Sequence, residues 1–161
     1  MSPQTPTQTA SDPDIMALER FLPYRLSVLS NTVSRAISRE YQQQFGLSIP
    51  QWRVMAVLGR FPDLSANEVA EKTAMDKVMV SRAVASLLDD GRLERQTDPR
   101  DRRRSVLRLS AEGRAIYRRI VPQALGYEAR LLQALSPAER AALDRILDRL
   151  QAAGIALGEE A

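Results

Sequence analysis

Residues 64–113 of this chain, LSANEVAEKTAMDKVMVSRAVASLLDDGRLERQTDPRDRRRSVLRLSAEG, decide its fold. Ser65 and Glu68 have the spacing of a capping box, which predicts a short helix that begins after Ser65. Asp76 can cap a further helix, whose apolar residues recur at helical spacing until Gly91 ends it. This stretch therefore predicts two consecutive helices joined by a tight turn.

Two short segments of alternating polar and apolar residues follow these helices, at 92–97 and 105–109. The polar loop DPRDRRR separates them, a pattern that predicts a β-hairpin. Helix, short helix, turn, helix and hairpin form a winged helix-turn-helix, in which the N-terminal end of the second helix can enter the DNA major groove.

The positive charge of the chain is concentrated in this hairpin. The whole chain has a formal charge of +3, but residues 92–108 contain seven arginines and three acids, a surplus of four positive charges. A solvated loop is the ordinary explanation for a charge run. Four arginines within 100–104 at a hairpin tip instead favour binding to a polyanion such as DNA.

Helical patterns flank the winged segment on both sides. Upstream, apolar residues three or four apart predict a helix from Ile15 to Tyr41, with a kink or break near Leu22 because of Pro23. Gly46 predicts its end, and SIPQ at 48–51 predicts the start of the next helix.

Downstream, Ser110 begins a helix in which Pro122 and Gly126 indicate a bend. Ser136-Pro-Ala-Glu139 then combines a capping box with proline at the first helical position, and so predicts a last helix. The expected fold is mainly α with a small β-wing, in a dimeric, six-helix subunit.

Composition excludes several classes of site. The chain contains no Cys and no His, which excludes disulfides, thiol redox sensors, zinc sites with sulfur or imidazole ligands, and His-dependent nucleophiles. No paired carboxylates in an apolar setting and no glycine-rich phosphate loop stand out. We therefore expect neither an enzyme nor a cofactor or metal.

Four regions are expected: a disordered tail at 1–13, an N-terminal dimerisation helix region at 14–47, the DNA-binding domain at 48–109, and C-terminal dimerisation helices at 110–157. The tail has neither the basic start nor the apolar run of a signal peptide, and no stretch has the length of a membrane span. A cytoplasmic protein without membrane contact is expected.

Residues 64–113 resemble the DNA-binding core of the MarR family of bacterial transcription regulators, and the order of six helices extends the likeness over about 14–155. The wing sequence Asp101-Arg-Arg103, followed by LRLSAEGR, is its most specific feature. The resemblance implies a homodimer, a pseudo-palindromic operator in double-stranded DNA, and repression that a small ligand relieves.

The resemblance also implies roles for individual residues. Lys77, Ser81 and Arg82 would meet bases and phosphates in the major groove, and Arg103 would enter the minor groove. Asp101 would orient Arg103 through a charge-assisted hydrogen bond. Phosphate contacts are expected from two further arginines, Arg102 and Arg104.

Ligand-responsive members of the family have a pocket between the dimer helices and the DNA-binding lobe. Here it would use Leu22, Arg25, Leu26, Leu29, Ser30, Trp52 and Met55, although the apolar neighbours of Trp52 favour a core position over a ligand contact. FLPYRLSVLSNTVSRAI and IPQWRVMAVLG are similar to regulators of aromatic-acid and hydroxycinnamate catabolism. The expected effector is therefore a small aromatic acid or its CoA thioester.

One alternative of another class stays open at this point. A helical dimer could act as a protein-interaction module, with its basic hairpin binding an acidic partner. Insensitivity to DNA sequence would distinguish that module from a sequence-specific repressor.

Overall fold

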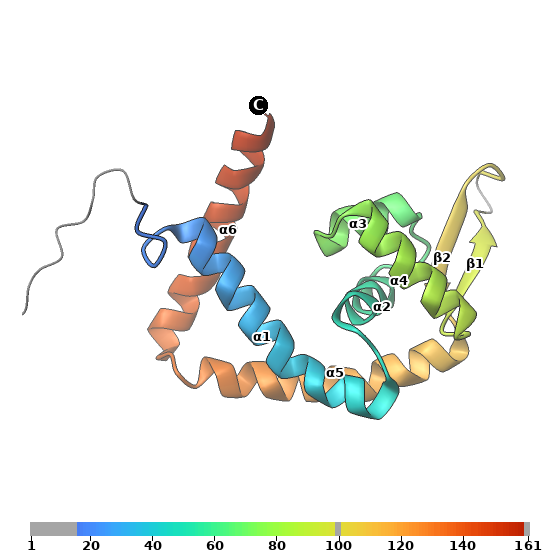
Figure 1. The fold of residues 1–161 in the computed structure, drawn as a ribbon, viewed down its shortest axis with the longest axis horizontal. Coiled ribbons are helices and arrows are strands. Elements are labelled where there is room, and N and C mark those ends of the chain that lie inside the picture. Colours follow the sequence, from blue (N-terminus) through green and yellow to red (C-terminus); the bar gives the residue numbers. More distant parts are fainter. Residues whose placement is uncertain (1–15, 99–100, 160–161) are drawn as a thin grey trace, which may run out of the picture. The chain divides into compact units, whose positions relative to one another are not determined.

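The computed structural model describes residues 16–98 and 101–159, which form six helices and one two-stranded sheet (Figure 1). The elements are α1 (Leu22–Phe45), α2 (Ile49–Arg60), α3 (Ala66–Thr73), α4 (Lys77–Asp89), β1 (Leu93–Thr97), β2 (Ser105–Leu109), α5 (Ala111–Leu132) and α6 (Pro137–Glu159). They form two compact units, one ending at Ile49 and one beginning at Pro50. The expected six-helix fold with a β-wing is confirmed, while the expected tail at 1–13 lies outside the described residues.

The first unit consists mainly of α1. This helix begins at Leu22 with Pro23 in its first turn, where the missing N–H of proline costs no hydrogen bond. Residues 18–20 form a turn, so the expected break near Leu22 is confirmed. Gly46 ends α1 in the left-handed conformation, with φ 63°, and its N–H donates to the Gln42 carbonyl at 2.9 Å.

Capping boxes start two helices of the second unit. At α3, the backbone N–H of Ser65 donates to Glu68 Oε2 at 2.7 Å, and the Glu68 N–H donates to Ser65 Oγ at 3.3 Å. At α6, the same reciprocal bonds join Ser136 and Glu139, at 2.8 and 3.3 Å. These two of the three predicted boxes are confirmed, because each side chain satisfies an N–H that the helix leaves without a partner.

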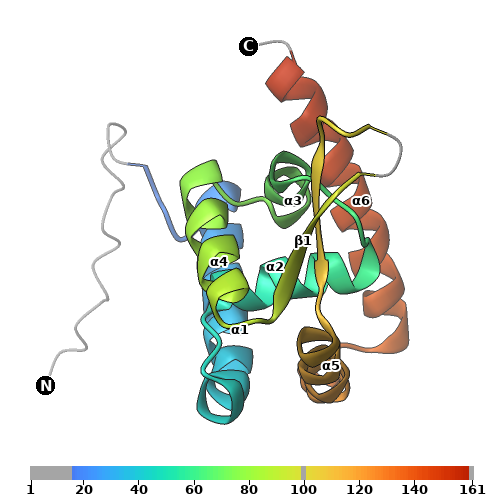
Figure 2. The ribbon, with the colours of Figure 1, turned by 90° about the vertical axis from the view of Figure 1, so that its right-hand side faces the viewer.

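The two strands form an antiparallel hairpin, the wing, in which Leu93 pairs with Leu109 and Thr97 with Ser105. The segment before α3 adds a short bridge to the wing: the Leu107 N–H donates to the Leu64 carbonyl at 2.8 Å. Figure 2 shows the wing beside α3 and α4. This bridge, which sequence periodicity did not predict, ties β2 to the segment that starts the helix-turn-helix.

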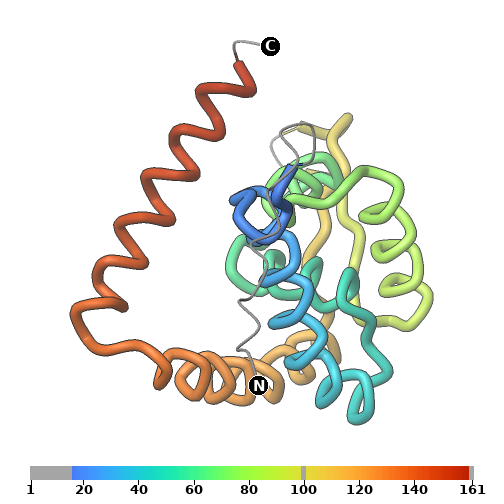
Figure 3. Tube along the Cα trace, turned by 60° about the vertical axis from the view of Figure 1, so that its left-hand side comes forward, coloured from blue at the N-terminus to red at the C-terminus, as the bar shows by residue number. Residues whose placement is uncertain are grey.

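The core of the second unit is aliphatic. Its fully buried side chains include Val69 of α3, Leu87 of α4, Leu107 of β2 and Ile120 of α5. Helix α5 continues through Pro122 to Leu132 without ending, and a turn then leads to α6 (Figure 3). No described helix combines the length and the apolar character needed to span a bilayer.

Candidate DNA-binding surface

The turn between α3 and α4 positions the second helix. Ala74 adopts the left-handed conformation, with φ 52°, which ends α3 and redirects the chain. Asp76 then caps α4, because its Oδ1 accepts the Met79 N–H at 2.8 Å. This arrangement leaves the first turn of α4 ordered and its N-terminal end open to solvent.

The three residues predicted to contact the major groove lie in the first two turns of α4. Lys77, Ser81 and Arg82 are all exposed. The apolar residues that hold α4 in the core lie on the opposite side of the helix: Val80, Ala83, Val84 and Leu87 are buried. The helix thus exposes the three predicted contact residues while its buried side chains anchor it in the core.

The wing tip is built around Asp101. Asp101 Oδ1 accepts the backbone N–H of Arg103 at 2.9 Å, and the Asp101 carbonyl accepts the Arg104 N–H at 2.9 Å. The sequence predicted a bond to the Arg103 guanidinium, whereas the structure places the carboxylate on the backbone, because an aspartate readily bonds the N–H two residues onward. Arg102 and Arg103 are exposed beside it, and Arg100 lies outside the described residues.

Two further wing arginines are engaged within the protein. The Arg104 guanidinium forms an ion pair with Glu68 of α3 and a weaker one with Asp98 at 3.4 Å. Arg108 donates to Asp63 Oδ1 through Nε at 2.9 Å and Nη2 at 2.6 Å. A phosphate contact by Arg104 would therefore compete with its ion pair to Glu68. The geometry favours a role for Arg104 in holding the wing against α3.

Glu68 joins the start of α3 to the wing. The Ser65 backbone N–H and hydroxyl, followed by the Arg104 guanidinium, lower the pKa of Glu68 from 4.5 to about 2. The capping-box spacing identified Glu68 as a helix cap. Its pairing with Arg104, 36 positions away, carries no local sequence signal.

Protonating Glu68 is expected to destabilise the fold. Its folded pKa lies below its unfolded value, so its contribution is present above pH 4.5 and is lost as the pH falls toward about 2. Because the Glu68 side chain is 38% exposed, solvent screening limits that contribution to about 1 kcal/mol. Glu68→Gln should lower the free energy of unfolding by this amount at pH 7 and flatten its dependence on acid, measured by urea denaturation.

Glu139→Gln is the matched control for this experiment. Glu139 has the same capping-box bonds, and Ser136 likewise lowers its pKa, but no arginine contributes to that shift. The difference between the two variants therefore isolates the Arg104 pair. Equal pH profiles for wild type and Glu68→Gln would contradict the assignment.

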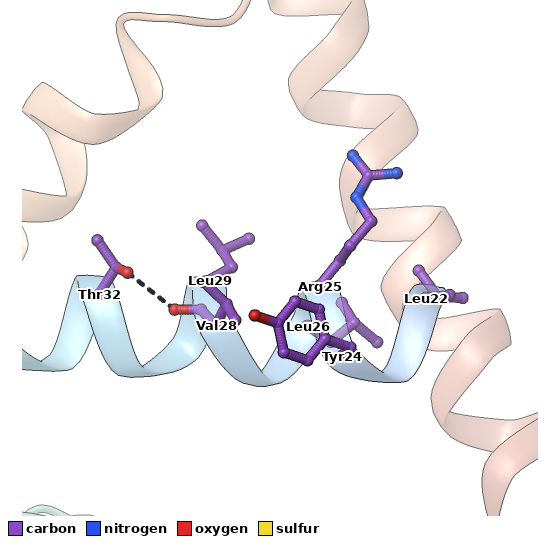
Figure 4. Close-up of a pocket in the computed structure, with 7 residues that line it drawn as sticks. All are labelled: Leu22, Tyr24, Arg25, Leu26, Val28, Leu29 and Thr32. Atoms are coloured by element: carbon purple, nitrogen blue, oxygen red, sulfur yellow. Dashed lines mark hydrogen bonds between the residues drawn. The ribbon is translucent and has the colours of Figure 1, made fainter. Parts of the chain in front are cut away.

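The expected ligand residues are divided between the two units. A hollow of about 470 Å³ lies along α1, and the described residues that line it are Leu22, Tyr24, Arg25, Leu26, Val28, Leu29 and Thr32 (Figure 4). Four of the seven predicted residues are among them, while Ser30 is not. In the second unit, Met55 is fully buried and Trp52 stacks on Tyr117 of α5, with ring centroids 5.9 Å apart.

Sequence reasoning missed Tyr24, Val28 and Thr32 as lining residues. Thr32 Oγ1 donates to the Val28 carbonyl at 2.8 Å. Helical spacing from Arg25 and Leu29 could have identified Val28 and Thr32, since residues three and four apart share a face. Among the described residues, no group of three or more carboxylates lies close enough to hold a metal ion.

Helices α3 and α4 joined by a tight turn and followed by the β1–β2 hairpin place this chain in the winged helix-turn-helix class of proteins. The sequence profile of the MarR family matches residues 45–104. The transcriptional repressor Rv2887 of Mycobacterium tuberculosis is 28% identical over 131 residues, covering 81% of this chain and 91% of that protein.

Solved structures agree with this match. A MarR/EmrR family transcriptional regulator from Acinetobacter sp. ADP1 superposes with a TM-score of 0.78 at 26% identity, covering 84% of this chain and 96% of that chain. BpsR of Bordetella bronchiseptica, whose DNA binding is regulated by 6-hydroxynicotinic acid, has a TM-score of 0.72 at 25% identity, covering 85% and 97%. In sequence and in fold, the chain is therefore similar to transcriptional regulators of the MarR family.

Proposed function

We propose that this protein is a cytoplasmic, homodimeric repressor that binds a pseudo-palindromic operator and is released by a small aromatic acid or its CoA thioester. The observation that carries the DNA-binding part is that the basic residues at the start of α4 and the arginines of the wing tip are all exposed. Lys77, Ser81 and Arg82 enter the major groove in this proposal. Arg103 enters the minor groove and Arg102 binds phosphate, whereas Arg104 holds the wing against Glu68.

The homodimer is supported by unpartnered apolar surface on α1 and α6. Among the described residues of α6 none is buried, although Ile146, Leu147 and Ile155 are large aliphatic side chains. On α1, Leu22 and Leu29 are exposed. A helix with this much exposed aliphatic surface gains stability when a partner covers it.

DNA binding is expected to depend steeply on salt. A dimer that neutralises about 6 phosphates should show a slope near −5 in log affinity against log salt concentration. Fluorescence anisotropy with duplex from the region upstream of the protein's own gene measures this slope, with scrambled duplex as competitor. Equal affinity for both duplexes would overturn sequence-specific repression and favour the basic-hairpin interaction module.

The aromatic effector is supported by the chemistry of the α1 hollow and by one structural relative. Leucines line the hollow with Arg25 among them, and Figure 4 shows Arg25 and Leu29 extending to the same side of α1. An apolar surface with one guanidinium suits a planar carboxylate. The relative BpsR responds to 6-hydroxynicotinic acid, which is an aromatic acid.

An effector is expected to release DNA by favouring the conformation that cannot bind it. Release by about 10²-fold requires about 2.7 kcal/mol of differential affinity between the two conformations. A thermal-shift screen of aromatic acids and their CoA thioesters, followed by anisotropy on operator duplex, measures both effects. Arg25→Ala should weaken the response to the acid while leaving DNA affinity unchanged. A full response to the acid in that variant would show that Arg25 does not contribute to effector binding.

A further inference from the structure

Val78 lies at the centre of the solvent-exposed face of α4. Successive residues of a helix are about 100° apart. At this spacing, the buried side chains of α4 lie on one side of the helix. Val78 lies on the opposite side, on the same face as Arg82 and Ala85. Its side chain is 61% exposed, whereas Val80 and Val84 are 1% and 3% exposed. The position that amphipathic patterning reserves for a polar residue is occupied by a β-branched aliphatic side chain.

The charges around Val78 indicate what this face meets. Lys77 and Arg82 lie beside it in the first two turns, and the wing arginines Arg102 and Arg103 are exposed. At the other end of the same helix, Asp89 and Asp90 are exposed and repel phosphates. The N-terminal half of α4, which begins with Lys77 and Val78, is therefore the half that faces a polyanion.

In the major groove of DNA, the 5-methyl group of thymine is the apolar feature of the base edges. Both Val78 and its surroundings suit contact with this methyl group. In a helix its side chain has one strongly preferred χ1 rotamer, so contact costs little conformational entropy. Ala85 lies about two turns farther along the same face, and its small side chain lets the helix approach the bases.

We propose that Val78 reads thymine in each operator half-site by packing against its 5-methyl group. This rests on the proposed function, since it requires α4 to enter the major groove. Lys77, Ser81 and Arg82 then supply the polar contacts around an apolar centre. The contact makes Val78 a specificity-determining residue.

The test compares thymine with uracil, which differs from it by the 5-methyl group alone. A short duplex is selected by the wild-type protein from a random-sequence library, and is then prepared with uracil at each thymine position in turn. Wild type should lose about 4-fold in affinity for each methyl contact, and about 15-fold when both half-sites are changed. Val78→Ala should bind the thymine and uracil duplexes with equal affinity.

Met79→Ala is the matched control. Met79 is an adjacent apolar residue that is 43% exposed, but it lies at the edge of the face, about 100° from Val78. This variant should keep the thymine preference. Both side chains lie on the exposed part of α4, at 61% and 43% exposure, so circular dichroism should show that both variants stay folded.

The outcomes separate this inference from the function on which it rests. A thymine preference that Val78→Ala abolishes and Met79→Ala retains supports the contact. Selection of a specific duplex without any thymine preference, or with a preference that Val78→Ala retains, overturns the contact and leaves the repressor intact. Failure to select any sequence overturns both.

Discussion

Gly113→Ala is expected to destabilise the protein by about 3 kcal/mol, lowering its melting temperature by roughly 10 °C. A Cβ at Gly113 would lie 2.0 Å from the backbone oxygen of Arg92. Because that oxygen belongs to the main chain, it cannot rotate away as a flexible side chain does. The first turn of α5 or the turn before β1 must move instead.

Hydrogen bonds near this contact connect Gly113 to the DNA-binding surface, so the substitution should also displace that surface. The Arg92 carbonyl accepts the Ser110 N–H at 3.1 Å, and Ser110 Oγ donates to the Gly91 carbonyl at 2.7 Å. Ser110 Oγ also caps α5 by accepting the Gly113 N–H at 3.0 Å. These bonds join the start of α5 to the turn that links α4 and the wing, so displacing one end displaces the other.

Gly126→Ala is the matched control in the same helix. A Cβ at Gly126 meets nothing within 4 Å, so alanine should stabilise the helix by about 0.5–1 kcal/mol through its higher helix propensity. Thermal and urea unfolding of both variants measure the difference. Equal stabilities for the two would contradict the close packing of α5 on Arg92.

Arg103→Ala is expected to weaken operator binding by about 1–3 kcal/mol for each wing, and so by roughly 2–6 kcal/mol for a dimer that inserts both. The guanidinium is exposed, and the described bond at this residue, from its backbone N–H to Asp101, survives the substitution. Stability should therefore stay unchanged while anisotropy shows the loss of affinity.

Arg103→Lys is the control that separates charge from shape. Lysine keeps the positive charge but lacks the planar fork of arginine. It should preserve the salt dependence of binding and recover only part of the affinity, because a narrow minor groove attracts charge while its width is sensed by the inserted arginine. Wild-type affinity in the alanine variant would show that the wing tip does not contact DNA.

Local signals predicted the helix starts well. Ser65, Asp76 and Ser110 each cap the helix that they were expected to begin, since a short polar side chain next to an apolar periodic segment satisfies an N–H close to it in the sequence. Helix ends at Gly46 and strand β2 at Ser105–Leu109 were predicted for the same local reasons. The exposure of Lys77, Ser81 and Arg82 follows from helical periodicity.

Features that depend on residues far apart in the sequence could not be predicted from local patterns. Helix α5 continues through Pro122 without ending, which requires that neighbouring groups tolerate the missing N–H of proline. Arg104 was expected at phosphate and pairs with Glu68 within the protein. Met55 was expected to line a pocket; the structure shows that it is completely buried in the core, and its pocket role stays a prediction. In each case the outcome depends on neighbours that spacing along the chain does not specify.

Helix order, helix capping and the concentration of charge in the wing follow from the amino-acid sequence alone, because each depends on residues a few positions apart. Tertiary structure alone decided which arginines are engaged internally, that Leu64 pairs with Leu107, and that Gly113 touches the Arg92 backbone. Those contacts join residues more than twenty positions apart, and chain folding, rather than local preference, brings them within bonding distance.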